Sequence, residues 1–437
     1  FEPLTFTTGG GDDNITVTQW ATNQPFPPPQ RSNTYETQGG DDVVNVTGGD
    51  PAVASPFVFN PSHTIDTGAD NDTINFASSS SLFISNTPTI PNAPFQLLMG
   101  EGDDEVVVND AQSTGVFLAP NVNDRGVFAQ SEGIDQLTFN GDGGTTNFML
   151  FNEGDFAAFE DREVNLTAGN DNDAAANVVL TPVSPGNQLH YTGDDAIDFV
   201  VGGNDADTIQ GGDGTDIVFG QSGPDEIDLG QTGSGPGDNS SDFLVYTSAS
   251  DGDVQGNVGN QDIVTNFESG TDQLVITGSL FTQLNDAQAF TIGRNPGVIN
   301  VDNGNGGNQA ANAGYFFDTT ASGNGLTPSN LDDLSADGSL LNFLNSRTLT
   351  GSDQTDGSPS AGDDTVLFVN AEDVNGDAFT GMYVFESDDG DSVIDPGELN
   401  YIANIDPIED VGDITSADPT VNNFQDFLDN IDVDQSA

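Results

Sequence analysis

Basic residues are almost absent from this chain. Its 437 residues include 71 acidic and five basic ones, which gives a formal net charge of −66 at pH 7. All five basic residues are arginine, and lysine does not occur. Nucleic acids and anionic lipids bind basic patches, so we expect neither as a partner. A compact state with this charge repels itself strongly, so we expect bound cations or high salt to accompany folding.

Cysteine and long apolar runs are missing as well. Without cysteine, no disulfide can stabilise the fold. No apolar run approaches the ~20 residues that cross a bilayer, so no membrane span is expected. Tryptophan occurs once, at Trp20, which argues against an aromatic platform for binding sugars.

The apolar residues that are present favour an ordered chain. High net charge with low hydrophobicity is typical of disorder. Here, however, 34% of the residues are hydrophobic and 29 are Phe. They gather in short runs such as FVF, EVVV, NFMLF and NVVL, which are typical of β-strands. We therefore predict an all-β protein whose order depends on cations.

The pattern Gly-x-Asp-x-apolar recurs with a period near 30 residues. Its acids follow one another at steps of 29, 30, 32 and 31 residues, with a looser copy in the middle: Asp13, Asp42, Asp72, Asp104 and Asp135. Such a period is typical of a solenoid, whose stacked coils share one core. We predict a right-handed parallel β-helix, or β-solenoid, with wide coils over residues 1–190. The five acids are candidate calcium ligands, and the alternative is a plain solvated turn.

A shorter repeat follows at residues 202–228. It reads GGNDADTIQ, GGDGTDIVF and GQSGPDEID, three consecutive nine-residue units. The middle unit fits Gly-Gly-x-Gly-x-Asp-x-apolar-x at every position. The segment resembles the repeats-in-toxin (RTX) family, which implies a parallel β-roll with two nonapeptides per turn. In such a roll, turn carbonyls and Asp side chains hold Ca²⁺.

The resemblance also implies roles for single residues. The implied side-chain ligands are Asp207, Asp216 and Asp225. The implied core residues are Ile209, Val218 and Ile227. Asp205 and Gln221 depart from the glycines that are usual at their positions. Other acids in and just before these units are further candidate ligands: Asp195, Asp198, Asp205 and Asp213.

The stretch NQDIVTNFESGTDQLVITG at 260–278 looks like the segment that closes the β-roll in secreted RTX proteins such as the serralysins. The resemblance implies that Asp262 and Asp272 help to cap the last coils, and both are candidate calcium ligands. A cap is needed in any case, because an open strand edge would pair with another chain. We place the β-roll and its cap at residues 191–278.

Residues 279–437 form a β-rich C-terminal domain in this interpretation. Apolar spacing predicts a short helix within 328–346. Residues 387–398 resemble an EF-hand-like loop, which makes Asp389, Asp391 and Glu398 candidate ligands, whereas a plain acidic hairpin is the alternative. The acidic tail is compatible with the C-terminal export signal of RTX relatives, or equally with a capping element.

An active site is not apparent. The two histidines, His63 and His190, belong to no catalytic or metal spacing. H-E-x-x-H, G-x-S-x-G, a Walker loop and a thiol nucleophile are all missing. A carboxylate pair of the glycosidase type is not excluded by residue type alone. Because these catalytic motifs are missing, we do not expect an enzyme.

Lysine-free, Gly/Asp/Asn/Thr-rich chains with RTX units resemble bacterial surface-layer proteins and other secreted cell-surface polymers. The resemblance implies an extracellular location, export by type I secretion, Ca²⁺ as the cofactor, and a second copy of the chain as the partner. We expect a structural protein that assembles into a surface layer or filament. An adhesin that binds cell-surface glycans is the first alternative, and a polysaccharide-cleaving β-helix enzyme is the second.

Overall fold

The chain divides into two compact units, Phe1–Asp216 and Ile217–Ala437. The three predicted domains, residues 1–190, 191–278 and 279–437, remain a prediction. The computed structural model describes residues 4–19, 33–48, 57–58, 63–78, 82–85, 96–98, 101–110, 117–119, 128–129, 136–141, 149–150, 161–166, 176–179, 188–193, 197–202, 205–230, 240–252, 261–277, 292–294, 298–300, 314–319, 326–335, 338–350, 364–372, 378–388, 391, 393–409 and 413–416.

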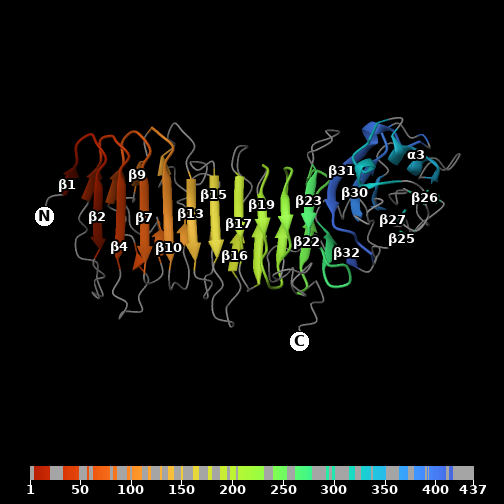
Figure 1. Ribbon diagram of the computed structural model, residues 1–437, viewed down its shortest axis with the longest axis horizontal. Helices are drawn as coiled ribbons and strands as arrows, with labels where there is room; N and C mark the ends of the chain where they lie inside the picture. The colour runs from red at the N-terminus through yellow and green to blue at the C-terminus, as the bar shows by residue number, and fades with distance from the viewer. Residues whose placement is uncertain are drawn as a thin grey trace. The chain divides into compact units, whose positions relative to one another are not determined.

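The first unit is built from parallel strands that lie side by side in the order of the sequence (Figure 1). Its longest row consists of β2 (Asn14–Gln19), β4 (Val43–Gly48), β7 (Thr73–Ser78), β10 (Glu105–Asp110), β13 (Gln136–Gly141), β15 (Asp161–Leu166), β17 (Gln188–Thr192) and β19 (Thr208–Gln210). The register pairs the first residue of β4 with the first residues of β2 and β7. The period read from the sequence is therefore the distance between paired strands.

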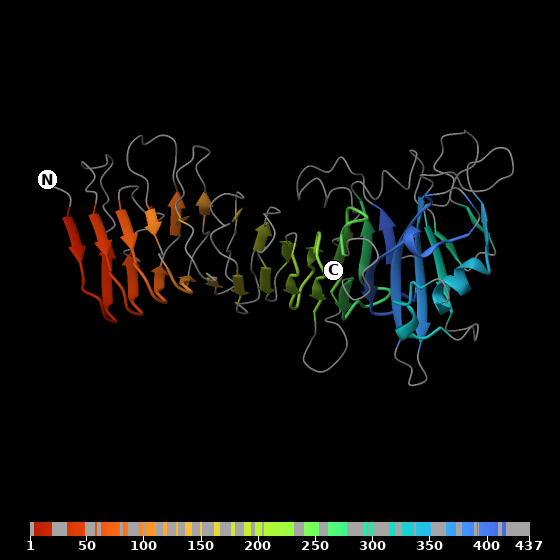
Figure 2. The same cartoon turned by 90° about the horizontal axis from the view of Figure 1, so that it is seen from above.

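Shorter parallel rows accompany this sheet in the first unit (Figure 2). One row consists of β1 (Leu4–Thr7), β3 (Asn33–Glu36), β6 (His63–Asp66), β9 (Gln96–Leu98) and β12 (Phe128–Ala129). Another consists of β5 (Phe57–Val58), β8 (Leu82–Ser85), β11 (Phe117–Ala119) and β14 (Met149–Leu150). In addition, β16 (Ala176–Val179) pairs with β18 (Asp198–Val201). Each 30-residue repeat thus adds one strand to each of several sheets.

Alternation of side chains produces the core of the first unit. In β4, Val44 and Val46 are buried while Val43 and Asn45 are half-buried, as the two faces of a strand require. Register then places Val44 beside Ile74, and Ile74 beside Val106. These three side chains are each 1% exposed. A column of β-branched residues therefore runs through successive repeats.

The second unit also has parallel strands, joined to an antiparallel hairpin. One sheet has the order β21 (Glu226–Asp228), β23 (Asp262–Thr265), β31 (Leu399–Ile405), β30 (Ala378–Glu386), β29 (Asp364–Glu372), β27 (Gly314–Asp318) and β25 (Ile292–Arg294). Strand β30 pairs antiparallel with both β29 and β31. The smaller sheets consist of β20 (Ile217–Phe219), β22 (Phe243–Tyr246), β24 (Gln273–Ile276) and β32 (Ile414–Ser416), and of β26 (Val298–Asn300) with β28 (Thr348–Thr350).

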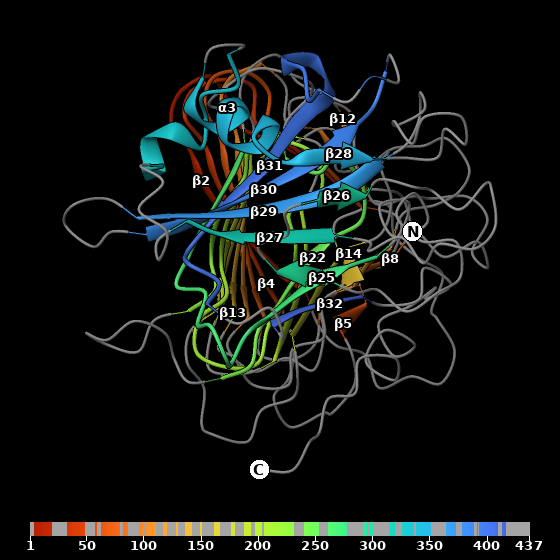
Figure 3. The ribbon, with the colours of Figure 1, turned by 90° about the vertical axis from the view of Figure 1, so that its right-hand side faces the viewer.

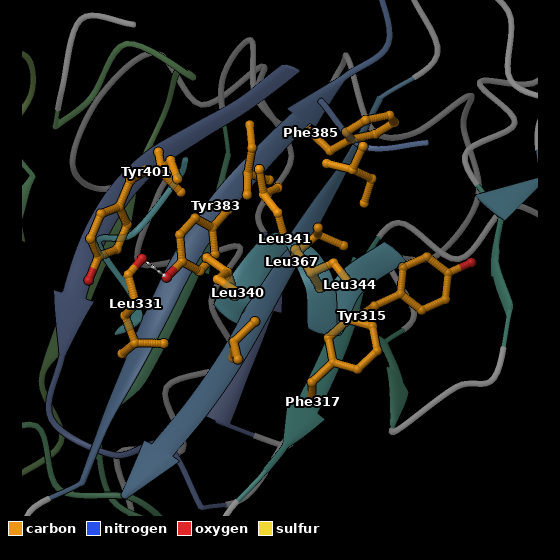
Figure 4. Packing of buried hydrophobic residues seen from close by; sticks show 14 of the residues in the cluster. Tyr315, Phe317, Leu331, Leu340, Leu341, Leu344, Leu367, Tyr383, Phe385 and Tyr401 are labelled. Carbon is orange, nitrogen blue, oxygen red and sulfur yellow. Dashed lines mark hydrogen bonds between the residues drawn. The ribbon is translucent and has the colours of Figure 1, made fainter. Parts of the chain in front are cut away.

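A helix covers part of the larger sheet of the second unit (Figure 3). This helix, α3 (Ser339–Asn345), buries Leu340, Leu341 and Leu344 in a cluster with side chains of β27, β29, β30 and β31 (Figure 4). Within the cluster, the Tyr383 hydroxyl donates a 2.6 Å hydrogen bond to the Leu331 carbonyl. Burial of the phenol raises the pKa of Tyr383. The second unit therefore has a core of its own.

The described residues are mostly strands, so the all-β prediction is confirmed. Besides α3, the helical segments within the described ranges are two short 3₁₀ turns, η1 (Pro328–Asn330) and η2 (Pro396–Glu398). Both η1 and α3 fall within the predicted helical stretch 328–346. No helix in the described part of the chain is long and apolar enough to cross a membrane.

Candidate calcium sites

The aspartates of the nonapeptides are buried. Asp198, Asp207 and Asp216 are 0%, 2% and 0% exposed. The main-chain N–H of Leu189 donates to Asp207 Oδ1 at 2.8 Å, and that of Asp198 donates to Asp216 Oδ1 at 2.9 Å. Both bonds join residues 18 positions apart, which is two nonapeptides. One oxygen of each acceptor carboxylate therefore binds the main chain two nonapeptides back.

The side chain two residues after each nonapeptide aspartate points inward. Ile209, Val218 and Ile227 are each 0% exposed, so the predicted core residues are confirmed. The residue between the aspartate and the core side chain varies, since Thr208 is half-buried, Ile217 is buried and Glu226 is exposed. In the turn before Asp216, Gly212 has φ 102° and Gly214 has φ 130°. Glycine reaches this left-handed region without steric cost, which explains its two fixed positions in the unit.

The turn chemistry fits calcium. A Cβ atom built on Gly193 would overlap both Asp198 Oδ2 and the Gly211 carbonyl oxygen, so these two oxygens converge on a notch that glycine leaves open. A carboxylate oxygen and a main-chain carbonyl are the hard ligands that Ca²⁺ prefers. The residues present therefore fit the ion that the resemblance implied. Gly220 leaves a similar space for a carboxylate oxygen, because a Cβ on Gly220 would overlap Asp225 Oδ2.

The acids of the 30-residue repeats form a ladder with the same geometry. Asp13 N–H donates to Asp42 Oδ1 at 2.7 Å, Asp42 N–H to Asp72 Oδ1 at 2.9 Å, and Asp72 N–H to Asp104 Oδ1 at 2.9 Å. Asp42, Asp72 and Asp104 are at most 2% exposed, whereas Asp13 is half-buried. Four of the five predicted acids are thus brought into one column, which we call the inner ladder. The fifth, Asp135, lies outside the described residues.

The first acid of each Gly-Asp-Asp turn forms a second column, the outer ladder. It runs in the opposite direction: Asp41 N–H donates to Asp12 Oδ1 at 3.3 Å, and Asn71 N–H donates to Asp41 Oδ1 at 3.3 Å. Asp103 N–H continues it to Asn71 Oδ1 at 2.9 Å. These four residues are exposed. The sequence analysis did not single them out, although their 30-residue spacing matches that of the inner ladder.

Burial disturbs the ionisation of the inner ladder. The pKa of Asp72 is raised to about 7, first because burial removes water from the carboxylate and then because Asp104 and Asp42 carry like charge. Hydrogen bonds from the Asp42 amide and the Thr67 hydroxyl oppose this shift. A fully ionised ladder is therefore costly unless a cation or a proton offsets the charge.

In the closing segment, both oxygens of each predicted acid have hydrogen bonds. Asp262 accepts from Asp225 N–H at 3.0 Å and from the Tyr246 hydroxyl at 3.0 Å. Asp272 accepts from Asp242 N–H at 3.0 Å and from Glu268 N–H at 2.6 Å. These contacts suit the capping role that the resemblance implied for the two acids.

Two acids from near the C-terminal end of the described chain join the same segment. Asp413 Oδ2 accepts from Ser269 Oγ at 2.6 Å and from Gly270 N–H at 3.0 Å. Asp406 Oδ2 accepts from Asn266 N–H at 2.5 Å, and burial raises the pKa of Asp406. No sequence spacing connects partners about 140 residues apart, so the sequence analysis missed both acids.

The EF-hand-like loop uses its acidic last position to hold main-chain amides. Glu398 is 2% exposed. Its Oε1 accepts from Asp388 N–H at 2.8 Å and its Oε2 from Asp395 N–H at 3.0 Å. Asp391 is exposed and accepts from Val393 N–H at 2.7 Å. Asp389 lies outside the described residues, so the ligand set predicted for this loop stays a prediction.

The remaining candidate acids are placed as follows. Asp205 is half-buried, Asp213 is exposed, and Asp195 lies outside the described residues. In the part of the chain that the structure describes, no three or more His, Cys, Asp or Glu side chains gather as a metal site. A cation at these turns would therefore need main-chain oxygens in addition to carboxylates.

Comparison with known families supports this chemistry. Residues 192–227 match the RTX calcium-binding nonapeptide repeat in four copies. These repeats bind calcium, so the predicted repeats and the predicted cofactor are confirmed. The match begins ten residues before the three units read from the sequence and therefore includes the turn from Gly193 to Asp198. No curated protein matches the chain.

Proposed function

We propose that the chain is a secreted structural protein that folds with calcium and assembles with further copies of itself into an extracellular surface layer or filament. In this proposal, the parallel strands form a right-handed β-solenoid with wide coils, followed by an RTX β-roll and a smaller β-rich C-terminal domain. RTX repeats are typical of proteins exported by type I secretion, which supports the extracellular location. No catalytic activity is part of the proposal.

The observation that carries the proposal is the repetition of buried carboxylates in a chain with a net charge of −66. They lie in register at Asp42, Asp72 and Asp104, and again at Asp198 and Asp216, while Asp207 is buried beside the other sheet. Buried ionised groups need a compensating charge, and five arginines cannot supply it. Calcium at the turns would lower the repulsion between stacked repeats, so folding and calcium binding would occur together.

The outer ladder favours assembly. Asp12, Asp41 and Asp103 present exposed carboxylates on three of four successive turns, with Asn71 on the turn between Asp41 and Asp103. Two such rows on neighbouring molecules would repel each other without divalent cations and could be bridged by them. Chains without calcium would stay apart in the same way, because their like charge keeps them soluble.

A calcium titration tests the proposal. Far-UV circular dichroism should show β-structure increasing with Ca²⁺, and light scattering with electron microscopy should show ordered sheets or filaments at millimolar Ca²⁺. Mg²⁺ at equal ionic strength is the control, because Mg²⁺ requires a stricter octahedral geometry and gives up its water reluctantly.

Two other results would replace the proposal. Folding without assembly, together with binding on a glycan array, would favour the adhesin. Release of sugars from a polysaccharide substrate would favour the enzyme. A chain that stays equally structured after exhaustive dialysis against EGTA in dilute buffer would contradict the calcium-dependent fold itself.

A further inference from the structure

We propose that the inner ladder of the 30-residue repeats is itself a calcium site, formed by the turns that end at Asp42 and Asp72 and separate from the nonapeptides. The matched repeat family covers residues 192–227 and does not extend to these turns. The inference concerns ion binding alone and does not depend on assembly.

First, one oxygen of each carboxylate, Oδ2, is left for a cation. Asp42 and Asp72 are 1% and 2% exposed, and Oδ1 of each accepts a main-chain N–H. Oδ2 of both residues is buried and has no hydrogen-bond partner within the described residues, so the Thr67 hydroxyl that bonds to the Asp72 carboxyl does not serve its Oδ2. A buried carboxylate oxygen without a donor is costly, so a bound cation would remove a cost that the fold otherwise bears.

The second step is the conformation of the turn. Gly68 has φ 96° and Asp70 has φ 82°, four and two residues before Asp72. Gly212 and Gly214 have φ 102° and φ 130° at the same two positions before Asp216. The left-handed region is unfavourable for Asp70, and Gly40 N–H donates to its Oδ2 at 3.1 Å. The turn before Asp72 thus repeats the backbone pattern of the nonapeptide turn.

The third step is a supply of main-chain oxygens. A Cβ on Gly68 would overlap the Thr37 carbonyl oxygen and would lie 3.2 Å from that of Gln38. A main-chain carbonyl also approaches Gly193, although there it comes from Gly211, later in the chain, whereas Thr37 and Gln38 precede Gly68. Carbonyl oxygens of one turn therefore lie against the next turn, close in sequence to the two buried carboxylates. Carboxylate and carbonyl oxygens together are the donor set of Ca²⁺.

The fourth step concerns the source of positive charge. No lysine or arginine occurs in the sequence between Arg31 and Arg125, a stretch that contains Asp42, Asp72 and Asp104. Its one histidine, His63, begins β6, nine residues before Asp72. These repeats therefore contain no permanently charged cationic side chain that could offset the ladder. A divalent cation from solution offsets two carboxylates at once, which suits adjacent members of the ladder.

The test counts calcium ions bound to the full chain by equilibrium dialysis with radioactive Ca²⁺. The variant Asp42→Asn/Asp72→Asn keeps Oδ1 as an acceptor while removing the charge. The matched control, Asp12→Asn/Asp41→Asn, makes the same two changes in the outer ladder. All three proteins are compared at Ca²⁺ concentrations below those that increase light scattering, where no outer-ladder carboxylate bridges two molecules. We expect the first variant to bind at least one ion fewer than the wild type, and the control to bind the wild-type number. An unchanged number in the folded Asp42→Asn/Asp72→Asn protein would overturn the site.

A second measurement decides the matter if that variant does not fold. Hydrogen exchange is followed in peptides covering residues 33–48 and 63–78 of an Asp207→Asn/Asp216→Asn chain, whose nonapeptide sites are impaired. Slower exchange in these peptides on addition of Ca²⁺ is the expected result, since the ion binds locally. Exchange that is independent of Ca²⁺ there would overturn the site, whatever the light-scattering experiment shows about assembly.

Discussion

The main-chain N–H of Asp42 donates a 2.9 Å hydrogen bond to Oδ1 of Asp72, 30 residues later in the chain. The bond lies just before the two strands begin. Val43 and Thr73 are the first residues of β4 and β7 and pair with each other, and Asp42 and Asp72 directly precede them. A slip of one residue would turn buried valines outward and would also separate the carboxylate from its amide. The inner ladder therefore specifies the register of the parallel strands.

Replacing Asp72 by alanine should destabilise the 30-residue repeats. The Asp42 amide would remain buried without its acceptor, which costs about 1–3 kcal/mol. Asp72→Asn keeps the acceptor and should lose less. Urea unfolding, followed by the fluorescence of Trp20 in EGTA with high NaCl to screen charge, measures both. Asp103→Ala, at an exposed position of the outer ladder, is the control and should change stability by about 0.5 kcal/mol or less. Equal losses at Asp72 and Asp103 would contradict the role of the inner ladder.

In EGTA with high NaCl, where salt in place of calcium screens the carboxylates, the stability of the folded chain should depend on pH through Asp72. The pKa of this carboxyl is about 7 in the folded chain, against an ordinary value of 3.8. Below the lower value both states are protonated. As the pH rises from 3.8 to about 7, the unfolded chain ionises while the folded chain keeps its proton, so the folded state loses stability. Above about 7 no further loss comes from this group.

Comparing Asp72→Asn with the wild type isolates this contribution. Other carboxylates titrate in both proteins, so the difference between their free energies of unfolding reports Asp72. The difference should move in favour of the asparagine variant between pH 4 and 7 and then level off. A difference that is constant over this range would show that the folded and unfolded states bind the Asp72 proton equally.

The sequence predicted the repeats well because period and polarity are local properties. Asp42 and Asp72 are separated by the pairing distance of their strands, and the apolar position of the Gly-x-Asp-x-apolar pattern falls on Val44, which is buried. The nonapeptides were recognised for the same reason, although the three units read from the sequence began at residue 202 and left out the matched residues from 192.

Contacts of other kinds could not be read from the sequence. Asp406 and Asp413 reach the closing segment from about 140 residues away, and no period links them to Asn266 or Ser269. The role of Asp262 was implied only in outline, because its second partner is a tyrosine hydroxyl rather than another turn. These contacts join residues that are distant in sequence and meet only in the folded chain, so local sequence patterns do not determine them.

Gly68→Ala should destabilise the repeats more than a typical surface change. A Cβ at this position would lie 2.9 Å from the Gln38 carbonyl carbon, and φ 96° is strained for alanine. Left-handed backbone costs about 1–2 kcal/mol for a residue other than glycine, and the close contact adds to it. Gly9→Ala is the control, because a Cβ there meets nothing within 4 Å. Urea unfolding of the two variants should separate them; similar midpoints would show that the turns do not approach each other closely.

Tyr246→Phe should weaken the closing segment by removing the donor to Asp262 Oδ2. Tyr246 is 2% exposed and Asp262 is 0% exposed, so water cannot readily replace the hydroxyl. Removing a hydrogen-bond donor from a buried carboxylate costs about 1–3 kcal/mol. A double-mutant cycle with Asp262→Asn separates the pair from other effects, since residues in direct contact are expected to be non-additive. Hydrogen exchange in peptides covering residues 240–252 and 261–277 gives the local stabilities. If the two single losses simply add in the double variant, the hydroxyl and the carboxylate do not stabilise each other.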